Sequence, residues 1–145
     1  MTYEQAIAYV DSYTKSGKPM ENLARFVVLM RQLGNPHTDF RSIHIAGTNG
    51  KGSTSVFINN ILIDAGYTVG LYTSPFIYEF NERIQIDNIP INDDELVSVM
   101  TEVAEKVNVM LKEGYEHPTE FELITAAAFL YFKRKKCDYV VLEVG

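Results

Sequence analysis

The sequence predicts an α/β fold, a doubly wound and mainly parallel β-sheet flanked by helices. Three short segments, at 41–46, 67–72 and 139–144, are predicted as strands, and the last of them is continuously apolar apart from Glu143, which suits a strand buried on both faces. Stretches with helical spacing of apolar residues separate these segments, and strands that alternate with helices favour a parallel sheet. The first segment leads directly into a glycine-rich loop, so strand, loop and helix follow one another without a break.

Two amphipathic helices are predicted before the first strand. Thr2 and Gln5 match a capping box, which would begin the first helix. The second helix is expected to end at Gly34 and Pro36, because glycine caps helices and proline cannot continue them. Its expected buried face, at helical spacing, consists of Leu23, Phe26, Val27, Met30 and Leu33.

Helix and strand continue to alternate after the glycine-rich loop. Residues 53–65 have a helical pattern, which Gly66 is well placed to cap before the second strand. Further along, 83–86 and 89–91 are expected as an exposed extended pair. Asp87–Asn88 would form the turn between them, because both residue types favour turns.

Two more helices are predicted before the last strand. Asn92 precedes three acidic residues, which suit the first turn of a long helix. Thr119 and Glu122 match a second capping box, for a helix that ends in the basic run 133–136. The expected buried stripe of the long helix consists of Leu96, Val99, Met100, Val103 and Val107.

Composition narrows the class of protein. The 145 residues suffice for one domain with a sizeable core, and the formal net charge of −6 does not indicate a nucleic-acid partner. Cys137 is the single cysteine, so no internal disulfide can form, and we expect it buried as a small apolar residue. The start lacks a signal-peptide pattern, and no apolar run approaches the length of a membrane span. We therefore expect a cytoplasmic protein with no nucleic-acid or membrane partner.

The glycine-rich loop predicts a phosphate-binding site. A strand, a glycine turn and a helix N-terminus present backbone N–H groups and the positive end of a helix dipole to an anion. Lys51 can lie over the terminal phosphates of ATP, and Ser53 or Thr54 can reach Mg²⁺. The spacing differs from the usual P-loop, since Gly52 separates the lysine from the first hydroxyl. The expected ATP-binding residues are Gly47, Thr48, Asn49, Gly50, Lys51, Gly52, Ser53 and Thr54.

The glycine-rich loop is one of several motifs that follow one another along nearly the whole chain. In chain order they are Leu33–Pro36, the loop Gly47–Ser53, Tyr72–Pro75 with Phe80–Ile84, Thr119–Glu122 and Leu142–Gly145. Together they resemble the motifs of folylpolyglutamate synthases, within the Mur ligase superfamily. The resemblance implies a Mur-ligase-like ATPase domain with a P-loop. It also implies that residues 1–145 are the N-terminal part of this ATP-binding domain, with the rest of it and a C-terminal domain outside this sequence.

Glu143 is unusual, because an isolated carboxylate is costly in a buried strand. A glutamate that points to solvent at the strand end is the plain alternative. Ligands of open α/β sheets bind beyond the carboxyl ends of strands, where Glu143 and the loop would both lie. The resemblance implies that Glu143 and Ser74 are Mg²⁺ ligands.

The resemblance also implies contacts with a pterin-bearing substrate, at Phe76, Arg83, Thr119 and Phe121. Each position can also be explained by structure alone. An aromatic residue such as Phe76 can fill a core, and Thr119 can act only as a helix cap, with Phe121 packed beneath the helix.

The implied reaction is ATP-dependent formation of an amide bond. Phosphoryl transfer to a carboxylate of a folate would give an acyl phosphate, which the amine of L-glutamate then attacks, with Lys51 in the catalytic role. Some family members also glutamylate dihydropteroate, and many of these have His where this chain has Phe76. A peptidoglycan-type Mur ligase and a nucleotide-binding module without activity are competing hypotheses. An incomplete sheet would also leave apolar surface uncovered, so we expect the chain alone to self-associate.

Overall fold

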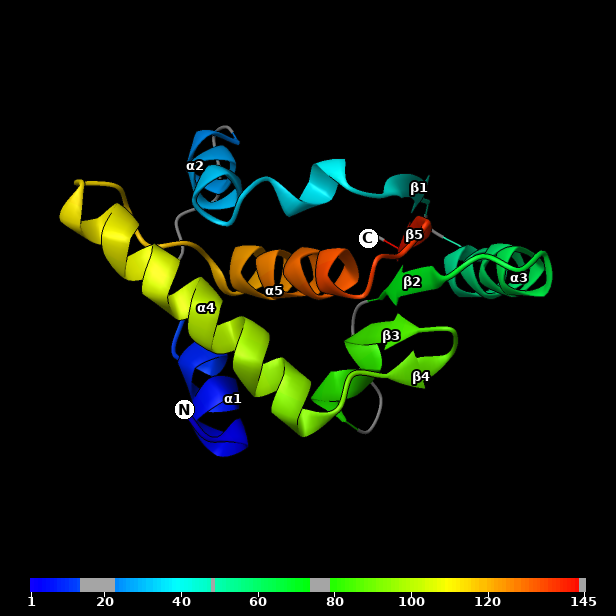
Figure 1. Ribbon diagram of the computed structural model, residues 1–145, viewed down its shortest axis with the longest axis horizontal. Coiled ribbons are helices and arrows are strands. Elements are labelled where there is room, and N and C mark those ends of the chain that lie inside the picture. The colour runs from blue at the N-terminus through cyan, green and yellow to red at the C-terminus, as the bar shows by residue number, and fades with distance from the viewer. Residues whose placement is uncertain (14–22, 48, 74–78, 144–145) are drawn as a thin grey trace. The chain divides into compact units, whose positions relative to one another are not determined.

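The computed structural model describes residues 1–13, 23–47, 49–73 and 79–143 (Figure 1). The chain divides into two compact units. The helical unit contains Met1–His37 and Asp93–Tyr131, and the sheet unit contains Thr38–Asn92 and Phe132–Gly145. The predicted α/β class is confirmed, and the glycine-rich loop belongs to the sheet unit.

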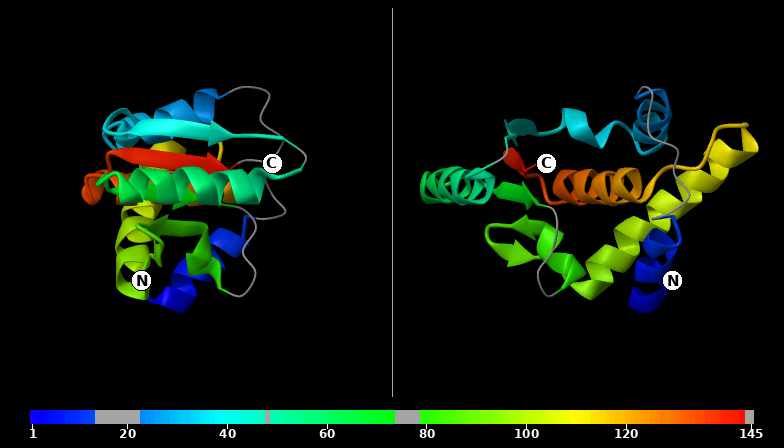
Figure 2. Two further views of the ribbon diagram at one scale, coloured as in Figure 1. Left: turned by 90° about the vertical axis from the view of Figure 1, so that its right-hand side faces the viewer. Right: turned by 180° about the vertical axis from the view of Figure 1, so that it is seen from behind.

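The sheet has five described strands in the order β1-β5-β2-β3-β4. β1, β5 and β2 run parallel, as the sequence predicts, and the left view of Figure 2 shows the arrows of β1 and β5 pointing the same way. Their carboxyl ends therefore meet at one edge, which we call the carboxyl edge. The strands are β1 (Arg41–Ile45), β2 (Val69–Tyr72), β3 (Ile84–Ile86), β4 (Ile89–Pro90) and β5 (Tyr139–Glu143).

The β3–β4 hairpin extends the sheet on the far side of β2. Its turn lies at Asp87 and Asn88, as predicted, and both residues have positive φ, of 50° and 66°. The expectation of an exposed extended pair was wrong for β3. This strand pairs antiparallel with β2, so Ile84 lies opposite Tyr72 and is fully buried.

Helix α3 (Lys51–Asp64) covers one face of this sheet, as the left view of Figure 2 shows. It begins two residues before the predicted start at Ser53. Apolar side chains of the helix pack against alternating residues of the strands, which is the usual way to bury a parallel sheet. This cluster comprises Val69, Leu71 and Val141 of the strands, with Ile45, Tyr139, Ile58, Leu62 and Ile63 packed against them.

The opposite face of β2 contacts the aromatic ring of Phe132. Gly70 alternates with Val69 and Leu71, so a Cβ at this position would point away from α3. Such a Cβ would lie 2.7 Å from Cδ1 of Phe132. Glycine at position 70 therefore allows the ring to pack directly on the strand backbone.

The helical unit is built around α4 (Asp93–Lys112), against which α1 (Tyr3–Asp11) and α2 (Ala24–Gln32) pack. The predicted stripe of α4 is buried, and Met110 continues it. The capping box at Thr2 and Gln5 is confirmed, with its two hydrogen bonds of 2.8 and 3.2 Å. Helix α5 (Glu120–Arg134) contributes residues through Tyr131 to this unit and its last turn to the sheet unit. No helix in the described part of the chain is long and apolar enough to cross a membrane.

The buried face of α2 differs from the predicted one. Leu23 and Val27 are exposed, whereas Leu29 is completely buried together with Met30 and Leu33. Helical spacing fits both sets of residues, so periodicity alone could not choose between them. In the first turn Arg25 and Phe26 are partly buried, whereas Val27 lies on the surface like the cap residue Leu23.

Candidate functional site

The glycine-rich loop has the backbone geometry of an anion site. Gly47 has a backbone φ of 142° and Gly50 a φ of 74°, and residues that have a Cβ rarely adopt such angles. A Cβ built on Gly47, Gly50 or Gly52 would meet no atom within 4 Å among the described residues. The space beside the backbone is therefore open, as the close approach of a phosphate requires.

The N-terminus of α3 faces this loop. Gly50 is the N-cap, with no side-chain cap among the described residues, and the N–H of Thr54 donates a helical hydrogen bond of 3.0 Å to the carbonyl of Gly50. The N–H groups before Thr54 have no carbonyl partner within the helix. They lie at the positive end of the helix dipole, where an anion is favoured. Lys51 is half-buried at the first position, and Ser53 is exposed. Thr48 lies outside the described residues.

Glu143 ends β5 at the carboxyl edge, beside the loop. It pairs in register with Ile45, the last residue of β1, which lies two positions before Gly47. Side chains alternate along a strand, so Glu143 shares the α3 face with Tyr139 and Val141. Its side chain is half-buried. The carboxylate is therefore at the edge and on the face where the loop and the first turn of α3 lie.

The other expected metal ligand, Ser74, lies outside the described residues. β2, which ends two residues earlier in the chain, is a neighbour of β5, since Tyr72 pairs with Leu142. Among the described residues no three His, Cys, Asp or Glu side chains group as a metal site. One carboxylate and one hydroxyl are still a suitable protein contribution to Mg²⁺, which keeps waters and phosphate oxygens as its other ligands.

The segment Phe80–Arg83, a short 3₁₀ helix, also reaches the carboxyl edge. The N–H of Thr73, directly after β2, donates to the carbonyl of Arg83 at 3.0 Å. Phe80 is buried, and the Arg83 guanidinium carbon lies 5.3 Å from its ring centre. Arg83 is thereby brought to the same edge as Glu143. Phe76 lies outside the described residues.

The start of α5, in the helical unit, contains the remaining two expected substrate contacts. The N–H of Thr119 donates to Glu122 Oε2 at 2.8 Å, and the N–H of Glu122 donates to Thr119 Oγ1 at 3.2 Å. The predicted capping box is thus confirmed. Phe121 is 51% exposed and does not pack beneath the helix. About half of this residue is therefore accessible to a ligand.

Sequence reasoning missed two features around Glu122. Arg25 of α2 binds its carboxylate in an ion pair, with the shortest contact at 2.9 Å. His117 stacks on Tyr13, with ring centres 3.4 Å apart. Burial, opposed by the Pro118 carbonyl, lowers the pKa of His117. The residues of each pair are far apart in the sequence, and no local pattern signals either contact.

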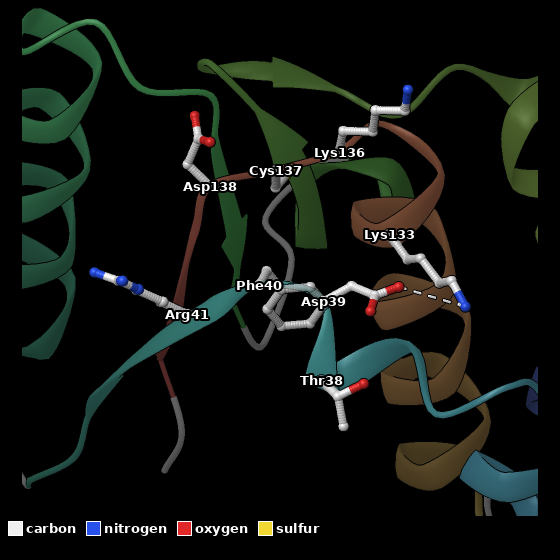
Figure 3. A pocket seen from close by; sticks show the side chains of 8 residues that line it. All are labelled: Thr38, Asp39, Phe40, Arg41, Lys133, Lys136, Cys137 and Asp138. Atoms are coloured by element: carbon white, nitrogen blue, oxygen red, sulfur yellow. Dashed lines mark ion pairs between the residues drawn. The ribbon is translucent and has the colours of Figure 1, made fainter.

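The sheet unit also contains a cavity of about 680 Å³ (Figure 3). Arg41 and Asp138 line it at the starts of β1 and β5, so it lies at the opposite sheet edge from the loop. Lys133 pairs with Asp39 at 3.4 Å, and Arg41 points away from this pair (Figure 3). The cavity is therefore separate from the candidate nucleotide site.

Cys137 also lines this cavity and is buried, as predicted. Burial, with smaller effects of the Asp87 and Asp138 charges, raises the pKa of its thiol to about 12. A thiol with this pKa remains protonated at neutral pH, and it is not a nucleophile there.

Comparisons with known proteins match the whole chain to one group of enzymes. Dihydrofolate synthase/folylpolyglutamate synthase of Bacillus subtilis strain 168 is 46% identical over 99% of this chain and 33% of its own length. Folylpolyglutamate synthase of Lacticaseibacillus casei is 42% identical over all of this chain and 34% of its own length. A solved structure described as an FPGS–AMPPCP–folate complex superposes with a TM-score of 0.92 and 43% identity, and the match covers 100% of this chain and 35% of that one.

The chain thus spans about a third of the length of the relatives it matches. No family model matches it. The similarity extends over every motif described above, and the fold agrees with the matched part of the solved structures. The chain is therefore homologous, along its whole length, to the N-terminal part of folylpolyglutamate synthase/dihydrofolate synthase.

Proposed function

We propose that this chain is the N-terminal part of the ATP-binding domain of a folylpolyglutamate synthase. The enzyme would add L-glutamate to the glutamate tail of a folate. The observation that carries the proposal is the carboxyl edge of the sheet, where the open glycine loop, the α3 N-terminus and Glu143 lie together. The relative solved with AMPPCP and folate supports this choice of ligands.

The first step would transfer the γ-phosphoryl group of ATP to the terminal carboxylate of the folate, which gives an acyl phosphate and ADP. Loop N–H groups and the α3 dipole would hold the phosphates, and Lys51 would offset their negative charge. Glu143 and Ser74 would hold Mg²⁺, which supplies further neutralisation of the phosphate charge.

The second step would form the amide. The amine of L-glutamate attacks the acyl carbon, inorganic phosphate leaves, and the amine loses a proton. Phosphate is a better leaving group than oxide, so ATP makes the carboxylate reactive. Residues of the chain would then act mainly by positioning, as is usual in phosphoryl transfer.

Four residues are candidates for contacts to the folate. The candidates in the sheet unit are Arg83 and Phe76, and those in the helical unit are Thr119 and Phe121. Exposure of Phe121 supports stacking on a flat heterocycle over a role in the core. The single cysteine, which permits no internal disulfide, fits a cytoplasmic location.

Glutamate incorporation tests the proposal. The complete protein that carries these residues is incubated with ATP, Mg²⁺ and labelled L-glutamate, together with either a folate or dihydropteroate. Labelled folate polyglutamate is the expected product. Labelling of dihydropteroate as well would favour a bifunctional enzyme, which relatives such as the Bacillus subtilis protein support. ATP binding without labelling of either acceptor would favour a nucleotide-binding module and contradict the proposal.

A further inference from the structure

The Arg25–Glu122 pair is a two-pronged interaction inside the helical unit. Arg25 Nε donates to Glu122 Oε2 at 2.9 Å, and Arg25 Nη2 donates to Glu122 Oε1 at 3.0 Å. Two parallel bonds fix the orientation of both groups, which a single contact between point charges does not. Glu122 is only 1% exposed, and the Arg25 side chain is 13% exposed.

Glu122 also holds the first residue of the expected substrate-binding segment. Its Oε2 accepts the N–H of Thr119 at 2.8 Å while it accepts Arg25 Nε. Phe121 lies within this anchored turn and remains exposed. A chain of contacts therefore runs from Arg25 through Glu122 to the start of α5.

A capping box does not need such a partner. Its glutamate is commonly on the surface, and the helix N-terminus already favours the negative charge. A buried carboxylate does need a countercharge, but a lysine would supply one without the two parallel hydrogen bonds of a guanidinium. The guanidinium adds geometry, because it fixes the plane of the Glu122 carboxylate.

We propose that Arg25 is a positioning residue for folate, which fixes the segment Thr119–Phe121 through Glu122. This inference rests on the proposed function, since it assumes that the segment binds the substrate. Arg25 itself need not touch the folate. Its guanidinium sets the orientation of the Thr119 backbone and of the Phe121 ring that follows it.

Arg25→Lys tests the geometry of the guanidinium separately from its positive charge, which lysine keeps. Arg31→Lys is the matched control, since Arg31 is exposed in the last turn of the same helix. Both variants are made in the complete protein. For Arg25→Lys we expect the KM for folate to rise roughly 5- to 20-fold, because the two parallel hydrogen bonds to Glu122 are lost while the positive charge is kept. The KM for ATP and the melting temperature should stay close to the parent values. Arg31→Lys should change none of these quantities.

An unchanged folate KM in a folded Arg25→Lys protein would overturn the proposal. A parallel rise of both KM values together with a lower melting temperature would also overturn it, because a purely structural role predicts that result. If Arg25→Lys does not fold, Glu122→Gln breaks the same pair from the other side, since its amide keeps the side-chain shape and one carbonyl acceptor but sets an NH2 donor against the guanidinium, and the folate KM, the ATP KM and the melting temperature are read in the same way.

Phe121→Ala distinguishes failure of this inference from failure of the proposed function. If Phe121→Ala raises the folate KM and Arg25→Lys does not, positioning by Arg25 is wrong and the binding segment stands. If Phe121→Ala leaves the folate KM unchanged while folate is still glutamylated, the segment does not bind folate and the positioning role of Arg25 fails with it. The proposed function itself fails only if neither acceptor is labelled. The expected result is that both variants raise the KM and that the double variant raises it by less than the product of the two effects.

Discussion

Glu143 and Ile45 face each other in register across β5 and β1, at the carboxyl edge of the sheet. Ile45 leads into the glycine loop two residues later, so the carboxylate and the phosphate-binding backbone start from neighbouring strand ends. This relationship supports the proposal that Glu143 would hold Mg²⁺, since a metal ion that offsets the charge of the phosphates must lie beside the loop.

Glu143→Gln should therefore weaken the response to Mg²⁺ and leave the fold intact. The amide keeps the size of the side chain but removes its negative charge. We expect the Mg²⁺ concentration for half-maximal activity to rise at least about 10-fold, since even indirect partners of metal ligands have effects of this size. A magnesium titration of the complete protein measures the change. Glu113→Gln, in the exposed turn directly after α4, is the control. An unchanged titration would remove Glu143 from the metal site.

Gly70→Ala should destabilise the sheet unit. The new methyl group would lie 2.7 Å from the Phe132 ring, so the ring or the strand must move. Such overpacking costs about 1–3 kcal/mol, which urea unfolding can measure. Phe132→Leu should relieve part of the clash, so the double variant should lose less stability than the sum of the single variants. Full additivity would contradict the contact.

Cys137 should react slowly in the native protein. Its thiol is buried and its pKa is raised to about 12, so little thiolate forms at pH 8. We expect alkylation by iodoacetamide to be at least about 100-fold slower than in urea at the same pH. Fast alkylation of the native protein would contradict the burial.

The raised pKa of Cys137 also predicts a change of stability with pH. The ordinary pKa of the thiol is 9.0, so between pH 9.0 and about 12 it ionises in the unfolded chain before it does in the folded one. The folded state then binds more protons, and its stability falls as the pH rises through this window. Cys137→Ala should reduce this loss of stability, as urea unfolding at several pH values can test.

The 145-residue chain, expressed by itself, should self-associate. The outer side of α3 exposes Val56, Phe57 and Ile61, with Phe57 69% exposed. Within the described sheet β1 pairs only with β5, so its other edge is open to a further strand. Sedimentation at increasing concentration should show assembly, which Phe57→Ser with Ile61→Ser should reduce. A monomer at every concentration would contradict this prediction.

Local patterns predicted the elements that depend on local chemistry. The capping boxes at Thr2 and Thr119 follow from hydrogen bonds between residues three apart, so the sequence is sufficient to identify them. The inner position of β5, between β1 and β2, agrees with its apolar run, in which Val140 and Val141 are completely buried. β1 is exposed or half-buried along its length, so no such run indicates its place in the sheet. The glycine loop could be assigned because strand, turn and helix are contiguous there.

Contacts between distant segments could not be predicted from one sequence. Both faces of α2 have helical spacing, and only packing against α4 decides that Leu29 is buried and Val27 is not. The antiparallel pairing of β3 with β2 depends on which strand edge is available. Arg25 lies 97 residues before Glu122, and an arginine in an amphipathic helix is usually a surface residue.

Lys51→Ala tests the central claim most directly, since it removes the charge expected to lie over the ATP phosphates. We expect the Kd for ATP, measured by calorimetry on the complete protein, to rise roughly 10- to 100-fold, as a lost charge-assisted hydrogen bond predicts. The melting temperature should be unchanged, and Lys112→Ala at the exposed end of α4 should bind ATP like the parent. A folded Lys51→Ala protein with unchanged ATP affinity and unchanged glutamate incorporation would contradict the assignment of the loop.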